Sequence, residues 1–113
     1  GTWHIAHTTI DLENWSDNQS TPGFTPEERA WMDQVLGPTG FIDTFREINR
    51  DGGEYTWWPK LDQEVPRSRQ EGWRIDYQMV GPNFRRHVVD AWIDYDATFS
   101  EFAPLFVEYD LTL

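Results

Sequence analysis

The end of the chain carries the pattern that most constrains the fold. From position 105 to 113 apolar residues take every second place, and they are Leu105, Val107, Tyr109, Leu111 and Leu113. A period of two puts these side chains on one face of a β-strand. A lone strand leaves its backbone groups and its apolar face uncovered. The rest of the chain must therefore supply a sheet and a core.

Other segments repeat this alternation. Arg74–Val80 and Val88–Tyr95 predict two further strands, and Thr2–His7 and Tyr55–Trp58 are weaker candidates. The residues expected on one face are Ile75, Tyr77 and Met79 in the first, and Val89, Ala91, Ile93 and Tyr95 in the second. On the opposite face of the first strand, Arg74 and Asp76 are expected to form a structural ion pair.

Two helices are predicted between the strands. Thr25 can cap a helix that begins at Pro26, with Glu28 completing a capping box and Gly37-Pro38 ending it. Phe41, Phe45 and Ile48 suggest a second short helix that ends near Asp51-Gly52-Gly53, and Lys60–Glu71 is expected to be an exposed loop. The order of elements indicates an α/β or α+β fold in a single domain over residues 1–113.

Composition limits the functions. The formal charge of −11 repels a phosphate backbone, so we expect poor affinity for DNA. Cysteine is absent, and no stretch is long and apolar enough to cross a membrane, so we expect a cytoplasmic protein without membrane contact. Seven Trp, seven Phe and four Tyr are a heavy aromatic load, which suits a core, an interface or a base-stacking surface alike.

Four segments together resemble the exonuclease III and abasic-site (AP) endonuclease family. They are Ile5–Asn14, Gly23–Arg29, Tyr55–Trp58 and Gly72–Tyr77, the last reading Gly-Trp-Arg-Ile-Asp-Tyr. The resemblance runs in the family's order from Gly1 to Leu113. It implies one half, the C-terminal half, of a four-layer α/β sandwich: a mixed sheet with helices on one face, whose other face a partner or second copy covers. The missing half carries an Asn and a metal-binding Glu that help such enzymes to hold Mg²⁺.

The family's active-site motifs are altered here. Gly-Asp-x-Asn stands as Gly1-Thr2-Trp3-His4, and Ser-Asp-His-x-Pro stands as Ser100-Glu101-Phe102-Ala103-Pro104. The resemblance implies catalytic positions at Asp76, His4 and Glu101, while Thr2 and Phe102 replace catalytic residues. Threonine is no base near neutral pH, and a phenyl ring holds no proton. We therefore expect no cutting and no bound Mg²⁺ in this chain.

Other family positions concern DNA. Trp57, Trp73 and Ile75 match residues that line the pocket for a base-free sugar in abasic-site-cleaving relatives, and Asn14 and Asn18 match residues that contact DNA. Without the resemblance, tryptophans in so small a domain are core residues more often than not, and Asn in a polar loop is usually a turn residue.

The pattern of changes leads to a hypothesis with rivals. We interpret the chain as a half-domain whose site was deliberately altered, inactive and self-associating as a homodimer, with Trp3, Trp92 or Phe106 on the exposed face. A naturally decayed pseudoenzyme is the rival origin. A complementary N-terminal half is the other possible partner and would allow an active phosphodiesterase. A designed metal or ligand site at His4 and Glu101 is the third alternative.

Overall fold

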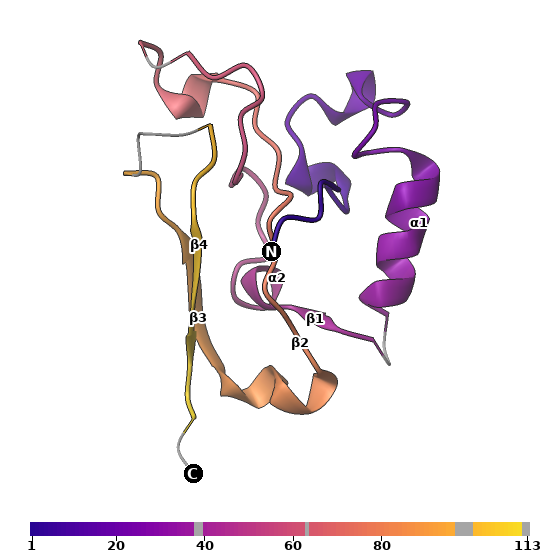
Figure 1. Ribbon diagram of the computed structural model, residues 1–113, viewed down its shortest axis with the longest axis vertical. Coiled ribbons are helices and arrows are strands. Elements are labelled where there is room, and N and C mark those ends of the chain that lie inside the picture. The colour runs from indigo at the N-terminus through magenta and orange to yellow at the C-terminus, as the bar shows by residue number, and fades with distance from the viewer. Residues whose placement is uncertain (38–39, 63, 97–100, 112–113) are drawn as a thin grey trace.

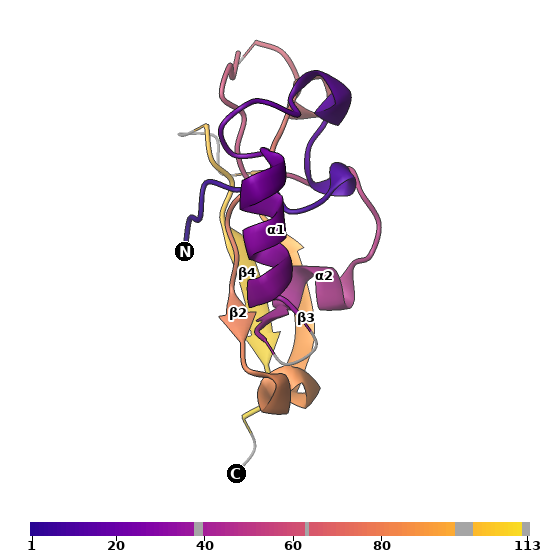
Figure 2. The ribbon, with the colours of Figure 1, turned by 90° about the vertical axis from the view of Figure 1, so that its right-hand side faces the viewer.

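The computed structural model describes residues 1–37, 40–62, 64–96 and 101–111. Two α-helices and four β-strands form its frame: α1 (Pro26–Val35), β1 (Ile42–Asp43), α2 (Thr44–Ile48), β2 (Met79–Val80), β3 (Val88–Ile93) and β4 (Leu105–Tyr109). Four 3₁₀ turns join them: η1 (Thr9–Asp11), η2 (Trp15–Asp17), η3 (Arg67–Arg69) and η4 (Pro82–His87). Figures 1 and 2 show α1 on the side of the molecule opposite β3 and β4, with α2 between them. The predicted α/β class is confirmed.

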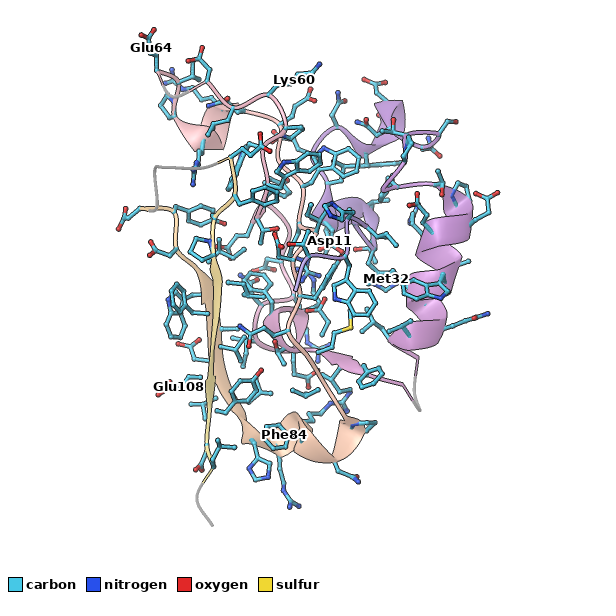
Figure 3. The ribbon with its side chains drawn as sticks, viewed as in Figure 1. Asp11, Met32, Lys60, Glu64, Phe84 and Glu108 are labelled. Carbon is cyan, nitrogen blue, oxygen red and sulfur yellow. The ribbon has the colours of Figure 1, made fainter. Side chains whose placement is uncertain are left out.

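Helix α1 begins where the sequence predicted. The Thr25 side chain accepts a hydrogen bond from the backbone N–H of Glu28, and the Glu28 carboxylate returns to the backbone N–H of Thr25 at 3.2 Å. This reciprocal capping satisfies N–H groups that a helix start leaves free. Met32 is fully buried and points from α1 toward the middle of the molecule (Figure 3). In the described part of the chain, no helix has the length and apolar character needed to cross a membrane.

Of three predicted strands at the centre, one is shorter than expected and two are reduced to isolated bridges. Only Met79–Val80 of the Arg74–Val80 segment is a strand, and it pairs antiparallel with β1. The Tyr55–Trp58 candidate contributes only isolated antiparallel bridges, from Trp57 to Trp73 and to Phe102. In the Thr2–His7 candidate a bridge joins Thr2 to Asp76, and His4 then takes a φ of 59°, a left-handed conformation that breaks an extended strand.

Strands β3 and β4 form an antiparallel hairpin, and Ala91, Ile93 and Leu105 point to its inner side. Tyr95, just past the end of β3, also packs on this side, with its ring centroid 6.0 Å from that of Trp58, but the prediction that Val89 shares the buried face was wrong. The register shifts between Val88 and Asp90, so Val89 lies outside the alternation and is exposed. Strand β4 ends at Tyr109; Leu111 is exposed, and Leu113 lies outside the described residues.

Helix α2 closes the core behind this hairpin. It ends at Ile48 and is shorter than the predicted helix. Asp43 caps its start, where the side-chain carboxylate accepts a hydrogen bond from the backbone N–H of Arg46. Its Phe45 packs with buried residues of the hairpin and of the central segments: Trp58, Ala91, Ile93 and Ala103. A second cluster lies beside it, made by Ala6, Leu12, Phe24, Trp73 and Ile75 with Trp57 and Phe102 packed against it.

A buried charge network joins the two halves of the chain. Arg74 is 1% exposed; its Nε donates to Asp11 Oδ1 at 2.7 Å, and its two terminal nitrogens donate to both oxygens of Asp43 at 3.1 and 2.6 Å. Arg46 also donates to Asp11. The predicted pair of Arg74 with Asp76 was wrong, because Arg74 turns inward to carboxylates from η1 and β1. Figure 3 shows Asp11 at the centre of the molecule.

The groups of this network shift each other's pKa values in the directions that favour their charged forms. Burial would raise the pKa of Asp11, but the guanidinium groups of Arg74 and Arg46 outweigh burial and hold that pKa below its ordinary value. Burial would lower the pKa of Arg74, but Asp43 and Asp11 raise it. Asp11 and Arg74 therefore keep their charges at neutral pH, and the network holds the segment around Arg74 in place.

Candidate functional site

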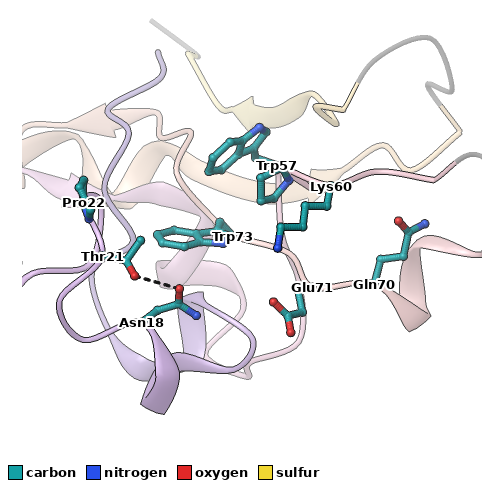
Figure 4. Close-up of a pocket in the computed structure, with 9 residues that line it drawn as sticks. Asn18, Thr21, Pro22, Trp57, Lys60, Gln70, Glu71 and Trp73 are labelled. Atoms are coloured by element: carbon teal, nitrogen blue, oxygen red, sulfur yellow. Dashed lines mark hydrogen bonds between the residues drawn. The ribbon is translucent and has the colours of Figure 1, made fainter.

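A groove of about 550 Å³ is lined by two neighbouring tryptophans, Trp57 and Trp73 (Figure 4). The backbones of Trp57 and Trp73 bond to each other in both directions, at 2.9 and 2.7 Å. Their rings meet edge to face, with centroids 5.8 Å apart and planes at 62°. Such aromatic walls admit a flat or apolar group and exclude others by shape. The remaining lining residues are Asn18, Thr21, Pro22, Pro59, Lys60, Gln70 and Glu71.

Asparagine side chains hold one rim. Asn18 Oδ1 accepts from the hydroxyl of Thr21 at 3.1 Å, the bond drawn in Figure 4, and Asn18 Nδ2 donates to the carbonyl of Asn14 at 2.9 Å. Asn14 has a φ of 58°, a left-handed conformation that Asn tolerates better than most residues, and its amide donates to Glu71 Oε1 at 3.0 Å. Asn14 and Asn18 therefore form the turns of this segment and the rim of the groove at the same time.

Gln70 fixes the loop over the other rim. Its side-chain oxygen accepts from the N–H of Asp62 at 2.7 Å, and its amide donates to the carbonyls of Asp62 and Val65, both at 2.8 Å. This clasp closes the loop that carries η3. The exposed Lys60–Glu71 loop was predicted, but not its clasp.

The groove brings together three of the five residues predicted for DNA contact: Asn18, Trp57 and Trp73. Asn14 reaches the rim only through its bonds to Asn18 and Glu71. Ile75 is 1% exposed in the core and does not line the groove. Thr21, Gln70 and Glu71 were missed, because no local pattern in the sequence shows which loop residues meet across a groove.

One altered catalytic position, Thr2, contacts the unaltered catalytic position Asp76. The hydroxyl of Thr2 donates to Asp76 Oδ1, while Asp76 Oδ2 is buried without a hydrogen-bond partner among the described residues. The backbone N–H groups of Ile75 and Asp76 both donate to the hydroxyl of Thr56, at 3.1 and 3.2 Å. Thr56, fully buried, was also missed by sequence reasoning. Asp76 is therefore held firmly, with one oxygen taken and one unused.

Phe102 occupies the position of the family's histidine. Its ring stacks on Trp57, with centroids 6.2 Å apart and planes at 21°, and it packs against the core cluster that contains Ile75. Trp57 forms one antiparallel bridge with Trp73 and another with Phe102, so it lies between them. The aromatic wall of the groove therefore continues through the place where the family has an imidazole.

His4 and Glu101 are not drawn into a common site. Both are exposed, and the backbone carbonyl of Glu101 accepts from the N–H of Trp58 at 2.9 Å. Over the part of the chain that the structure describes, no three His, Cys, Asp or Glu side chains converge as metal ligands would. Mg²⁺ prefers near-octahedral oxygen coordination, and these residues do not fit it. Ser100, in the same motif, lies outside the described residues.

Known proteins share this sequence and this fold. No family model matches the chain. An exodeoxyribonuclease of Streptococcus pneumoniae is 37% identical over 112 residues, which are 98% of this chain and 40% of the relative. The structure of a 3′ phosphatase from Neisseria bound to a product DNA hairpin superposes with a TM-score of 0.85 at 25% identity, over 97% of this chain and 43% of that one. An AP endonuclease from Leishmania major has a TM-score of 0.80 at 27% identity, over 96% of this chain and 33% of that one.

These matches place the chain in the class of exonuclease III-like and AP endonuclease-like sequences and folds. Within this class the chain corresponds to one half of an exonuclease III and AP endonuclease family protein, as its motifs predicted. It spans about two fifths of the length of the curated relative, 40%.

Proposed function

We propose that the chain is a half-domain of exonuclease III descent that keeps an aromatic groove but does not cleave DNA by itself. The observation that carries this proposal is the hydrogen bond from Thr2 to Asp76 beside the stacked ring of Phe102. Hydrolysis of a phosphodiester needs a base to activate water and charge to stabilise the phosphate. A hydroxyl and a phenyl ring supply neither near neutral pH.

The charges of the groove support weak binding of DNA. Lys60 and Glu71 are the two charged residues that line it, so they contribute one charge of each sign. Around them the chain carries a formal charge of −11. Affinity for nucleic acid depends mainly on Lys and Arg that displace counterions from phosphates. The groove therefore recognises shape, and strong attraction to the backbone is not expected.

The test is incubation of the chain with a duplex that contains one abasic site, with Mg²⁺ and separately with Mn²⁺. We expect no cleavage above the blank without protein, and the same result for an Asp76→Ala variant. Cleavage by the chain that Asp76→Ala abolishes would overturn the proposal. Cleavage that persists in Asp76→Ala comes from a contaminating nuclease. The chain is then purified again and the assay repeated, until it gives either no cleavage or cleavage that Asp76→Ala abolishes.

No observation favours the other functions. His4 has no hydrogen-bond partner in the described part of the chain, and neither His4 nor Glu101 belongs to a group of metal-binding side chains there. Deliberate alteration of the site, complementation by another half and self-association stay predictions.

A further inference from the structure

A second pocket, of about 360 Å³, lies on the helical side of the molecule. Its lining comes from η1, the end of α1, β1, α2 and η4. Among the described residues, none lines both this pocket and the aromatic groove, so it can be tested separately from the proposed function. We call it the arginine pocket, because four of the nine Lys and Arg residues of the chain meet in it: Arg46, Arg50, Arg74 and Arg85.

The arginine pocket lies away from the face that a second half would cover. On the side of the β3–β4 hairpin opposite its buried residues, Trp92 and Phe106 stack with ring centroids 5.8 Å apart and remain 45% and 44% exposed. Such apolar surface is what one sheet of a sandwich turns toward the other. Figures 1 and 2 show α1 on the opposite side of the molecule from this hairpin. Helices form the outer layers of a four-layer sandwich, so the arginine pocket stays open to solvent when the other half is present.

The charges of the arginine pocket leave a surplus of one positive charge. Among its Asp, Glu, Lys and Arg residues, four guanidinium groups face three carboxylates. Three of the guanidinium groups form salt bridges with these carboxylates, which belong to Asp11, Asp43 and Glu47. The fourth, Arg50, is exposed, and within the described residues its side chain forms no hydrogen bond or ion pair. Arg50 therefore has its donors available for a ligand.

Apolar side chains supply another part of the lining. Ile10 and Phe41 are 40% and 54% exposed, and Leu36 and Ile42 line the pocket with them. Sites for small molecules have volumes of about 300–1,000 Å³ and combine apolar walls with a few converging polar groups. The arginine pocket has both features and lies at the small end of this range.

We propose that the arginine pocket binds a small organic acid with a single carboxylate and an aromatic or branched apolar group. A guanidinium group donates two parallel hydrogen bonds to a carboxylate, and Arg50 is the group with free donors. The surplus of one positive charge matches a monoanion. The apolar part of the acid is removed from water against Ile10 and Phe41, which adds to the affinity.

Other ligands fit the arginine pocket less well. A phosphate dianion carries more negative charge than the surplus balances, and three carboxylates already line the pocket. A cation is repelled by Arg50, and a neutral apolar molecule leaves Arg50 without a partner. An extended macromolecular surface does not enter a volume of about 360 Å³.

The probe is benzoate, titrated into the ¹⁵N-labelled chain at about pH 7.5 and followed by the backbone amide signals of Ile10 and Glu47 in NMR. Acetate has the carboxylate without the ring, benzyl alcohol has the ring without the charge, and phenyl phosphate is mostly a dianion at this pH. The decisive variant is Arg50→Gln, and its matched control is Arg69→Gln. Arg69 lies in η3, is exposed, and within the described residues its side chain forms no hydrogen bond or ion pair, so the control removes the same charge elsewhere.

We expect benzoate to bind about tenfold more tightly than acetate, benzyl alcohol or phenyl phosphate. Arg50→Gln should weaken the binding of benzoate about tenfold, because a charge-assisted hydrogen bond is lost, whereas Arg69→Gln should weaken it less than about twofold. Phe41→Ala should weaken it about threefold without changing the far-UV circular dichroism, since this side chain is exposed. The proposal is overturned by the absence of saturable shifts up to about 20 mM benzoate. It is also overturned by equal losses in Arg50→Gln and Arg69→Gln, or by any comparison ligand that binds as tightly as benzoate.

Discussion

Replacement of Arg74 by methionine tests the buried charge network most directly. The substitution keeps an unbranched side chain of similar length but removes the guanidinium that bonds Asp11 and Asp43. Those two carboxylates are 1% and 9% exposed, so water cannot replace the lost bonds without opening the core. Arg46 still forms a salt bridge with Asp11, but within the described residues Asp43 has no salt-bridge partner other than Arg74.

The expected loss is a large part of the stability. Removal of one partner from a buried ion pair costs about 3–5 kcal/mol, because the other charge remains buried. A domain of 113 residues has a free energy of unfolding of about 6–17 kcal/mol at roughly 0.05–0.15 kcal/mol per residue. With a urea dependence of about 2 kcal/mol per molar, the unfolding midpoint should fall by about 2 M.

The assay is urea unfolding at neutral pH, followed by tryptophan fluorescence and by circular dichroism. Arg85→Met is the matched control, because Arg85 pairs with Glu47 at 3.2 Å while 57% of its side chain is exposed. Exposed pairs contribute about 0–1 kcal/mol, so this variant should be nearly as stable as the parent. Losses equal to within about 0.5 kcal/mol in the two variants would refute the assigned role of Arg74.

Three further predictions concern packing, capping and pH. In Gly72→Ala the new methyl group would lie 2.6–2.7 Å from the Tyr55 side chain, so the variant should lose about 1–3 kcal/mol of stability in urea unfolding. Gly81→Ala, where nothing lies within 4 Å of the new methyl group, should change the stability little. Equal effects of the two substitutions would contradict this packing. Thr25→Ala removes the cap of α1 and should cost about 1 kcal/mol by the same assay, and an unchanged midpoint would contradict it. The pKa of Asp11 is lower in the folded chain than in the unfolded chain, so Asp11 contributes its full stabilisation above about pH 4. As the pH falls below that value, the unfolded chain binds the proton before the folded chain does, and this stabilisation is lost. Unfolding measured from about pH 6 to pH 3 should show a smaller fall in Asp11→Asn, and an identical fall would contradict the network.

The sequence predicted what local chemistry decides. The cap at Thr25 and the start of α1 depend on side chains three positions apart, and the structure confirms both. The alternation in β4 predicted its inner side correctly from Leu105 to Tyr109. In β3 the same reasoning failed at Val89, because a one-residue irregularity in register leaves no mark in the pattern of apolar residues.

Contacts between distant segments were beyond local patterns. Arg74 meets Asp11 and Asp43 across 63 and 31 positions, so its neighbour Asp76 was the only partner that strand alternation offered. Trp57 and Trp73 do line the groove, and they were singled out by their match to a family pocket rather than by their spacing; their role there stays a prediction. Ile75 stands two positions after Trp73, the spacing that would put both side chains on one strand face, but it is buried in the core and does not line the groove.

The clasp made by Gln70 has a consequence for the loop that it closes. Its three bonds to Asp62 and Val65 tie the two ends of the loop together independently of η3. The closed ends keep Lys60 and Glu71 at the groove, while Arg67 inside the loop lies over the buried ring of Trp58, 4.7 Å from its centroid, so the loop is anchored to the core as well as to itself.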